Sequence, residues 1–90
     1  MDRPYTLFYS LVHYKDNEVG SRSQEAIMAG SDEESFTKAK EFLERFSVGM
    51  IRPFYPQLLD GARVVAGPDS ENPSAFFGFY LYSPPPLTPA

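Results

Sequence analysis

A chain of 90 residues with a formal net charge of −4, 42% hydrophobic residues and no cysteine is expected to form one small domain. The lack of cysteine excludes disulfides, thiolate zinc sites and cysteine nucleophiles, and it favours a cytoplasmic location. No run of about 18 apolar residues occurs, so no contact with a membrane is expected, and the scattered basic residues of this acidic chain argue against a nucleic-acid partner.

The first predicted elements are two strands joined by a turn. Residues 5–15 (YTLFYSLVHYK) are rich in aromatic and aliphatic side chains and lack glycine and proline, which is typical of a strand. Residues 16–20 (DNEVG) favour a turn, and residues 23–30 (SQEAIMAG) predict a second strand hairpinned to the first. Neither face of the first strand is clearly polar, which predicts an inner strand or one whose second face meets another surface. Alternation places these side chains on one face: Tyr5, Leu7, Tyr9, Leu11 and His13.

A helix is predicted over Asp32–Ser47. Ser31 and Glu34 have the spacing of a capping box, and the acidic residues of the first turn suit the positive end of the helix dipole. Gly49 fits a C-terminal stop. Apolar side chains recur at helical spacing and predict one stripe that faces the core. This stripe consists of Phe36, Ala39, Phe42, Leu43 and Phe46.

The second half of the chain predicts a loop and two further strands. Residues 50–59 (MIRPFYPQLL) carry two prolines three residues apart, so we expect an ordered loop, with a helical turn near its end, and no regular strand. Asp60–Gly61 is a turn signal. Residues 62–67 (ARVVAG) and 74–83 (SAFFGFYLYS) predict the third and fourth strands, with a polar loop between them.

These elements predict a two-layer α+β domain over residues 1–83. One amphipathic helix packs on a four-stranded, mainly antiparallel sheet, in the order strand, strand, helix, strand, strand. Residues 84–90 form a proline-rich tail that we expect to be extended or disordered. The tail holds a PxxP string at Pro86–Pro89, but no basic residue flanks it to anchor it in a partner's groove.

The stretch FFGFYLY, residues 76–82, holds five aromatic rings in seven residues. Phe77, Phe79 and Leu81 alternate onto one face, where they can pack on the helix stripe. Because a single helix covers only one face of the sheet, the other face keeps aromatic surface from the first and last strands. Exposed aromatic patches mark interfaces, and tyrosine suits a half-wet contact. The candidate interaction residues are therefore Tyr5, Tyr9, Phe76, Tyr80 and Tyr82.

Several occupants of that second face remain open at the level of sequence: the 48–59 loop or the tail, a protein partner or second copy, single-stranded nucleic acid, or a small ligand. The stretch also resembles part of a strand of RNA-recognition motifs, because Phe77, Gly78, Phe79 and Tyr82 match four positions of its pattern. Ala75–Phe76 stand where that pattern has a basic residue and a glycine, so no family is assigned.

No cofactor, metal or catalytic site is predicted. His13 is the only histidine, and no sequence signal gives it a serine or carboxylate partner. One histidine without cysteine supplies no ordinary zinc set. The carboxylates of Asp32, Glu33 and Glu34 are already accounted for by the start of the helix, and the isolated glycines form no phosphate-binding loop. The chain is therefore not expected to be an enzyme.

The sequence thus predicts a small protein-interaction or accessory, regulatory domain. It would act through an aromatic sheet face or a strand edge, on a protein partner or on its own copy in a homodimer. The alternative is a single-stranded nucleic-acid-binding module that uses the same aromatic face. A third hypothesis, an enzyme with His13 in a cleft, has the least support from the residues.

Overall fold

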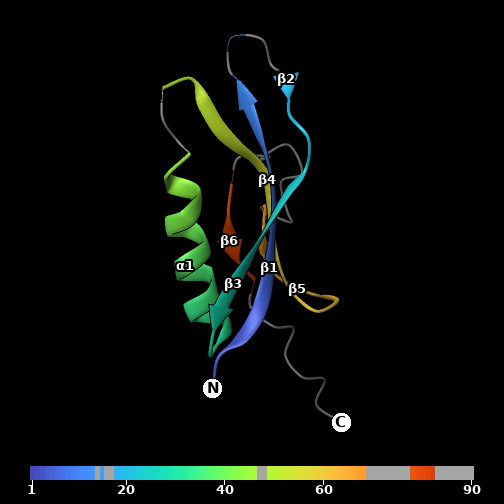
Figure 1. Ribbon diagram of the computed structural model, residues 1–90, viewed down its shortest axis with the longest axis vertical. Helices are drawn as coiled ribbons and strands as arrows, with labels where there is room; N and C mark the ends of the chain where they lie inside the picture. Colours follow the sequence, from blue (N-terminus) through green and yellow to red (C-terminus); the bar gives the residue numbers. More distant parts are fainter. Residues whose placement is uncertain (14, 16–17, 47–48, 69–77, 83–90) are drawn as a thin grey trace.

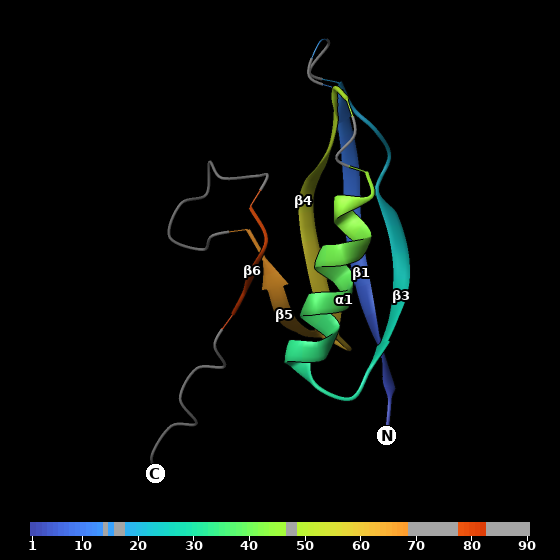
Figure 2. The same cartoon turned by 90° about the vertical axis from the view of Figure 1, so that its left-hand side faces the viewer.

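The structure is a computed structural model that describes residues 1–13, 15, 18–46, 49–68 and 78–82. The helix lies against one face of a single antiparallel sheet, so the domain has two layers (Figures 1 and 2). The predicted α+β class is confirmed, but the predicted count of four strands and their order are wrong. In chain order the elements are β1 Arg3–His13, β2 Glu18–Val19, β3 Ser23–Ala29, α1 Asp32–Glu44, β4 Ile51–Asp60, β5 Arg63–Gly67 and β6 Tyr80–Leu81.

The long strand β1 organises the sheet. The short β2 and then β3 pair along one edge of β1, β4 pairs along its other edge, and β5 and β6 follow beyond β4. The predicted hairpin of the first two strands is confirmed by the register of β1 and β3, in which Tyr5 lies opposite Ile27. Strand β2 lies within the segment predicted as a turn, where Val19 pairs with Val12.

The start of α1 follows from its capping residues. The Glu34 N–H donates to the Ser31 hydroxyl over 3.1 Å, as the capping box predicts. The Glu34 carboxylate accepts from the Gly30 N–H, one residue before the cap. This contact holds the pKa of Glu34 below its usual value, with Lys38 as a further cause. The helix ends at Glu44 with Arg45 as its C-cap, so the predicted helix extends too far over Arg45 and Phe46; its predicted last residue, Ser47, lies outside the described residues.

The core forms where the predicted stripe of α1 meets one face of the sheet. The Tyr9 ring lies 5.7 Å from that of Phe42 and 5.5 Å from that of Phe46, centroid to centroid. The Phe36 ring stacks on Phe79 at 5.0 Å. The largest fully buried apolar side chains come from three different strands and are Tyr5, Leu7, Leu58 and Val65.

The segment predicted as a loop, residues 50–59, is instead the inner strand β4, and this prediction is wrong. Its two prolines are accommodated by an irregular pairing with β1: the register shifts between Phe8 and Ser10, and Tyr55 adopts a positive φ of 51°. These are the marks of a β-bulge. In addition, β5 pairs with β4 only from Leu58 onward, so the hydrogen bonds between these two strands need no N–H donor from either proline. As a strand of the sheet, this segment does not cover the sheet's second face.

The last two predicted strands are recovered in part. The third predicted strand is β5, and the described part of the fourth is β6 with the residues beside it. The stack of Phe79 on Phe36 confirms that Phe79 faces the helix. The predicted positions of Phe76, Phe77 and the tail 84–90 lie outside the described residues.

Candidate functional site

The structure separates the residues predicted to form an interaction surface. Tyr5 and Tyr9 are buried beneath α1, with 0% and 8% of their surface exposed, so they are core residues in this fold. Tyr80 is 54% exposed at the β6 edge. Tyr82 is partly buried, and its hydroxyl donates to the Pro68 carbonyl. Phe76 lies outside the described residues, so its predicted role stays a prediction.

The face of the sheet opposite α1 carries a different set of apolar side chains. Directly opposed residues of antiparallel strands share a face, so the pairs Thr6–Leu59, Phe8–Gln57 and Ser10–Phe54 all lie on the side away from the core residues Leu7 and Leu58. Alternation adds the neighbouring strands to this face. We call this surface the open face. Register places these exposed or partly exposed apolar residues on it: Phe8, Val19, Met28, Phe54, Leu59, Val64 and Tyr80. Tyr55 at the bulge joins them, because its ring lies beside Arg22.

Several of these side chains reach solvent. Met28 is 48% exposed, Val64 43% and Tyr55 37%, while Phe8 and Leu59 are partly exposed between them. Exposed apolar side chains that are scattered singly need no explanation, but a set that spans several strands on one face is typical of a binding surface. The open face, which includes Tyr80 but neither Tyr5 nor Tyr9, is thus the best candidate surface.

Arg22 crosses the middle of the open face. It lies just before β3, and its guanidinium donates to the Phe54 carbonyl (3.1 Å), the Tyr55 carbonyl and the Gln57 side-chain oxygen (3.2 Å) on β4. It also contacts the Ser10 hydroxyl at 3.4 Å and lies 5.4 Å from the centre of the Tyr55 ring. Burial lowers the pKa of Arg22. Arg22 therefore ties the bulge of β4 to β1 and gives the open face a positive centre.

Charge is divided between the two sides of the sheet. Register places Arg52 opposite Val12 on the open face, and the described strand residues of this face include no carboxylate. Glu18 pairs with His13 and Glu25 with Leu7, so both point to the helix side. The open face of this acidic chain is therefore neutral to positive.

A second polar cluster lies on the helix side, at the start of α1. The Arg63 guanidinium donates to both oxygens of Asp32, over 2.8 and 2.9 Å, and to Asp60 over 2.9 Å. Arg3 joins Asp60 at 3.1 Å and Asp32 at 3.6 Å. The Tyr5 hydroxyl donates to Asp32 over 2.9 Å. These contacts join three segments of the fold. Because the two arginines and two aspartates neutralise one another, the cluster offers little net charge to a ligand.

The pKa values of this cluster reflect the same contacts. The hydrogen bonds from Arg63, aided by Tyr5, lower the pKa of Asp32 to about 2 from its ordinary 3.8. Arg63 also lowers the pKa of Asp60, and both carboxylates raise that of Arg63. Burial raises the pKa of Tyr5, and its hydrogen bond to Asp32 adds to this.

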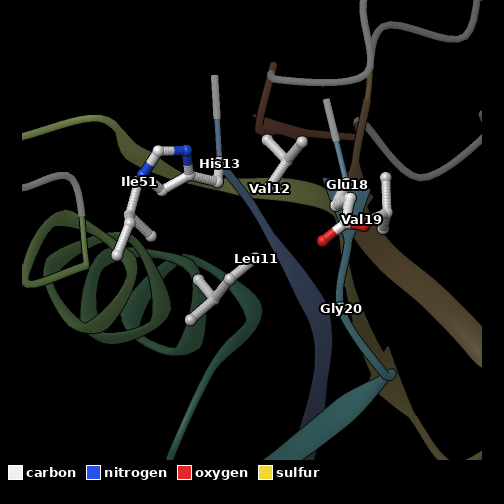
Figure 3. Close-up of a pocket in the computed structure, with 7 residues that line it drawn as sticks. All are labelled: Leu11, Val12, His13, Glu18, Val19, Gly20 and Ile51. Carbon is white, nitrogen blue, oxygen red and sulfur yellow. The ribbon is translucent and has the colours of Figure 1, made fainter. Parts of the chain in front are cut away.

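His13 lies in a hollow at the far end of the sheet. The hollow has a volume of about 410 Å³ and is lined by Leu11, Val12, His13, Glu18, Val19, Gly20 and Ile51 (Figure 3). The imidazole lies beside Ile51, and Glu18 lies across the hollow from it (Figure 3). These lining residues are mainly aliphatic and include no hydroxyl or thiol nucleophile. The expectation that the chain is not an enzyme stays a prediction.

Sequence predicts Tyr80 as an open-face residue but not the three residues that β4 contributes. Phe54, Tyr55 and Leu59 fall in a segment whose two prolines predict a loop, so no strand alternation is expected there. The apolar character of residues 50–59 is the one sequence feature that favours a strand here. A strand with two prolines is possible only when a β-bulge accommodates them.

Comparisons with protein-family models, with curated proteins and with solved structures gave no significant match. In the part of the chain that the structure describes, no helix is long and apolar enough to cross a membrane. The same residues contain no group of three or more potential metal ligands. The candidate site therefore depends on the fold and its surface chemistry alone.

Proposed function

We propose that this chain is a protein-interaction domain that docks a protein partner on the open face of its sheet. The observation that carries the proposal is the one-sided architecture: α1 covers one face, while the opposite face presents apolar and aromatic side chains from β1, β3, β4, β5 and β6. Aromatic anchors supply most of the binding energy of such contacts.

The chemistry of the open face specifies the kind of partner. Its side chains are mainly apolar, and its charged residues among those described are Arg22, near the middle, and Arg52. A complementary partner surface is mainly apolar and carries carboxylates that can face these two arginines, because matched potentials favour encounter and exclude basic surfaces. A role as an accessory or regulatory domain agrees with the small size of the chain and with the open face as its docking surface.

The proposal is tested with Val64→Lys on the open face and Thr37→Lys on the exposed surface of α1 as the matched control. Both positions are exposed, so neither change disturbs the core. Proteins enriched from a cell extract by the wild type and by the control, but not by Val64→Lys, are purified and titrated by calorimetry. We expect Val64→Lys to weaken binding by at least about tenfold.

The control keeps the added positive charge and changes only its place. If no protein distinguishes Val64→Lys from Thr37→Lys, the open face is not the docking surface. If both variants bind a purified partner equally well, the same conclusion follows.

A second candidate function is binding of single-stranded nucleic acid on the same face. It is favoured by one observation, the combination of aromatic rings and arginines with no carboxylate among the described strand residues of the open face. Bases stack on such rings, and arginine meets phosphate. The small number of cations on this face makes the protein partner the better-supported candidate.

A further inference from the structure

The outer border of β3 is a strand edge that no other described strand covers. Strand β3 pairs with β1 along one side only, and it forms one border of the sheet (Figure 2). An uncovered edge presents backbone N–H and C=O groups that can pair with another chain. The surface concerned is the backbone edge of the sheet, which adjoins the open face through the side chain of Met28.

The register identifies which residues of β3 turn their backbone groups outward. Met28 lies opposite Pro4, which has no N–H to donate. The Lys38 ammonium donates to the Met28 carbonyl over 2.8 Å, so this carbonyl points away from β1, already accepts one hydrogen bond and keeps a second lone pair for a further donor. Because outward and inward residues alternate along an antiparallel strand, Gln24, Ala26 and Met28 form the outward set.

Opposite charges stand near the two ends of this outward set. Glu25 points to the helix side, since it pairs with Leu7, and it is exposed. Lys38 reaches the other end of the strand from α1, also on the helix side; it lies 3.6 Å from the Glu34 carboxylate, and its side chain is 45% exposed, so a second carboxylate can approach it. The middle of the edge is the small, exposed Ala26. The edge is therefore complementary to itself when it is turned end for end.

We propose that β3 pairs with β3 of a second copy of this chain, antiparallel and centred on Ala26. In this register Ala26 faces Ala26 of the second copy, and Gln24 faces Met28 of the second copy. Each Glu25 then lies next to Lys38 of the other copy. Backbone hydrogen bonds give the pairing its affinity, and the two crossed charge pairs select this register over its neighbours.

The decisive variant is Ala26→Pro, with Ala26→Thr as its matched control. Proline removes an N–H that points away from β1, so the contact of β3 with β1 keeps its hydrogen bonds, and edge strands tolerate proline. Threonine keeps the N–H and favours strand structure. Analytical ultracentrifugation over a range of concentrations measures the dimer, and circular dichroism confirms that each variant is folded.

We expect the wild type and Ala26→Thr to dimerise with similar affinity and Ala26→Pro to do so at least about tenfold more weakly. A wild type that stays monomeric at every concentration would overturn the inference. So would a dimer that survives Ala26→Pro but is lost in Val64→Lys, because the second copy would then occupy the open face.

The charge pairs provide a second test that does not depend on proline. Because Glu34 pairs with Lys38 in the same copy, the charge variants are made in a Glu34→Gln background. Glu25→Lys alone and Lys38→Glu alone then each place like charges side by side in the dimer, and we expect each to weaken it. The double variant restores opposite charges and is expected to recover dimerisation. Failure of the double variant to exceed either single variant would contradict the proposed register.

Discussion

The cluster of Arg3, Asp32, Asp60 and Arg63 shows how single residues hold the two layers together. Asp32 stands at the start of α1, Arg3 begins β1, and the other two residues flank the turn between β4 and β5. Each carboxylate therefore joins parts of the chain that are far apart in sequence. The Tyr5 hydroxyl, buried beneath them, uses Asp32 as its acceptor.

This arrangement predicts a loss of stability in acid that depends on Asp32. Its pKa in the fold is about 2, below the ordinary 3.8, so its contribution is complete above the ordinary value and is lost as the pH falls toward 2. Asp32→Asn should cost about 1 kcal/mol at neutral pH, because Arg63 is half exposed and solvent screens the pair. Urea unfolding at a series of pH values measures both effects.

The comparison with Glu33→Gln, an exposed carboxylate in the same helical turn, isolates the pair from the general effect of removing a negative charge. The free energy of unfolding of Asp32→Asn should fall less steeply between pH 4 and pH 2 than that of the wild type. Equal slopes for the two proteins would show that Asp32 does not carry the effect.

At the scale of the element, α1 and β4 differ in how far sequence could predict them. The helix has local signals: a cap at Ser31, acids in its first turn and an apolar stripe of helical period. Strand β4 has no local signal for a strand that is stronger than the signal of Pro53 and Pro56 against one. Its pairing depends on the bulge opposite β1 and on the positive φ of Tyr55, which are properties of the assembled sheet and not of the segment.

The stripe of α1 predicts that Phe42→Ala destabilises the domain by roughly 2–3 kcal/mol, somewhat less than for a fully buried ring. Phe42 is partly buried, and its ring contacts those of Tyr9 and Phe46 edge-on. Phe42→Leu keeps apolar volume and should cost about 1 kcal/mol. Thermal and urea unfolding measure both. A Phe42→Ala variant as stable as Phe42→Leu would refute the packing of this ring.

At the scale of the whole molecule, the division of charge between the two sides allows the two candidate functions to be separated. We expect a fluorescent oligothymidine titrated at low salt to show no binding, because the described open face carries few cations. Binding that weakens with added salt and on Tyr55→Ala would instead support the nucleic-acid function. Fluorescence anisotropy gives the measurement, and Thr37→Ala serves as the control.

The layer architecture could be predicted from sequence, but the surface that it leaves uncovered could not. Alternation correctly grouped Tyr5, Tyr9 and Leu7 on one face of β1. It could not say which of two rich faces the helix would choose, and the candidate tyrosines of β1 proved to lie beneath α1. The choice depends on the long-range pairing of Leu7 with Leu58 in β4, a strand that sequence did not predict.

The one-sided placement of α1 has a consequence for the proposed pairing of β3 edges. A two-fold axis perpendicular to the sheet maps each face of the sheet onto itself. Both helices of the dimer would therefore lie on one side, and the two open faces would form one continuous surface on the other. A ligand with repeated docking motifs could then engage the two halves at once. The gain from such bivalency is commonly about 10² to 10⁴ in apparent affinity without any new contact.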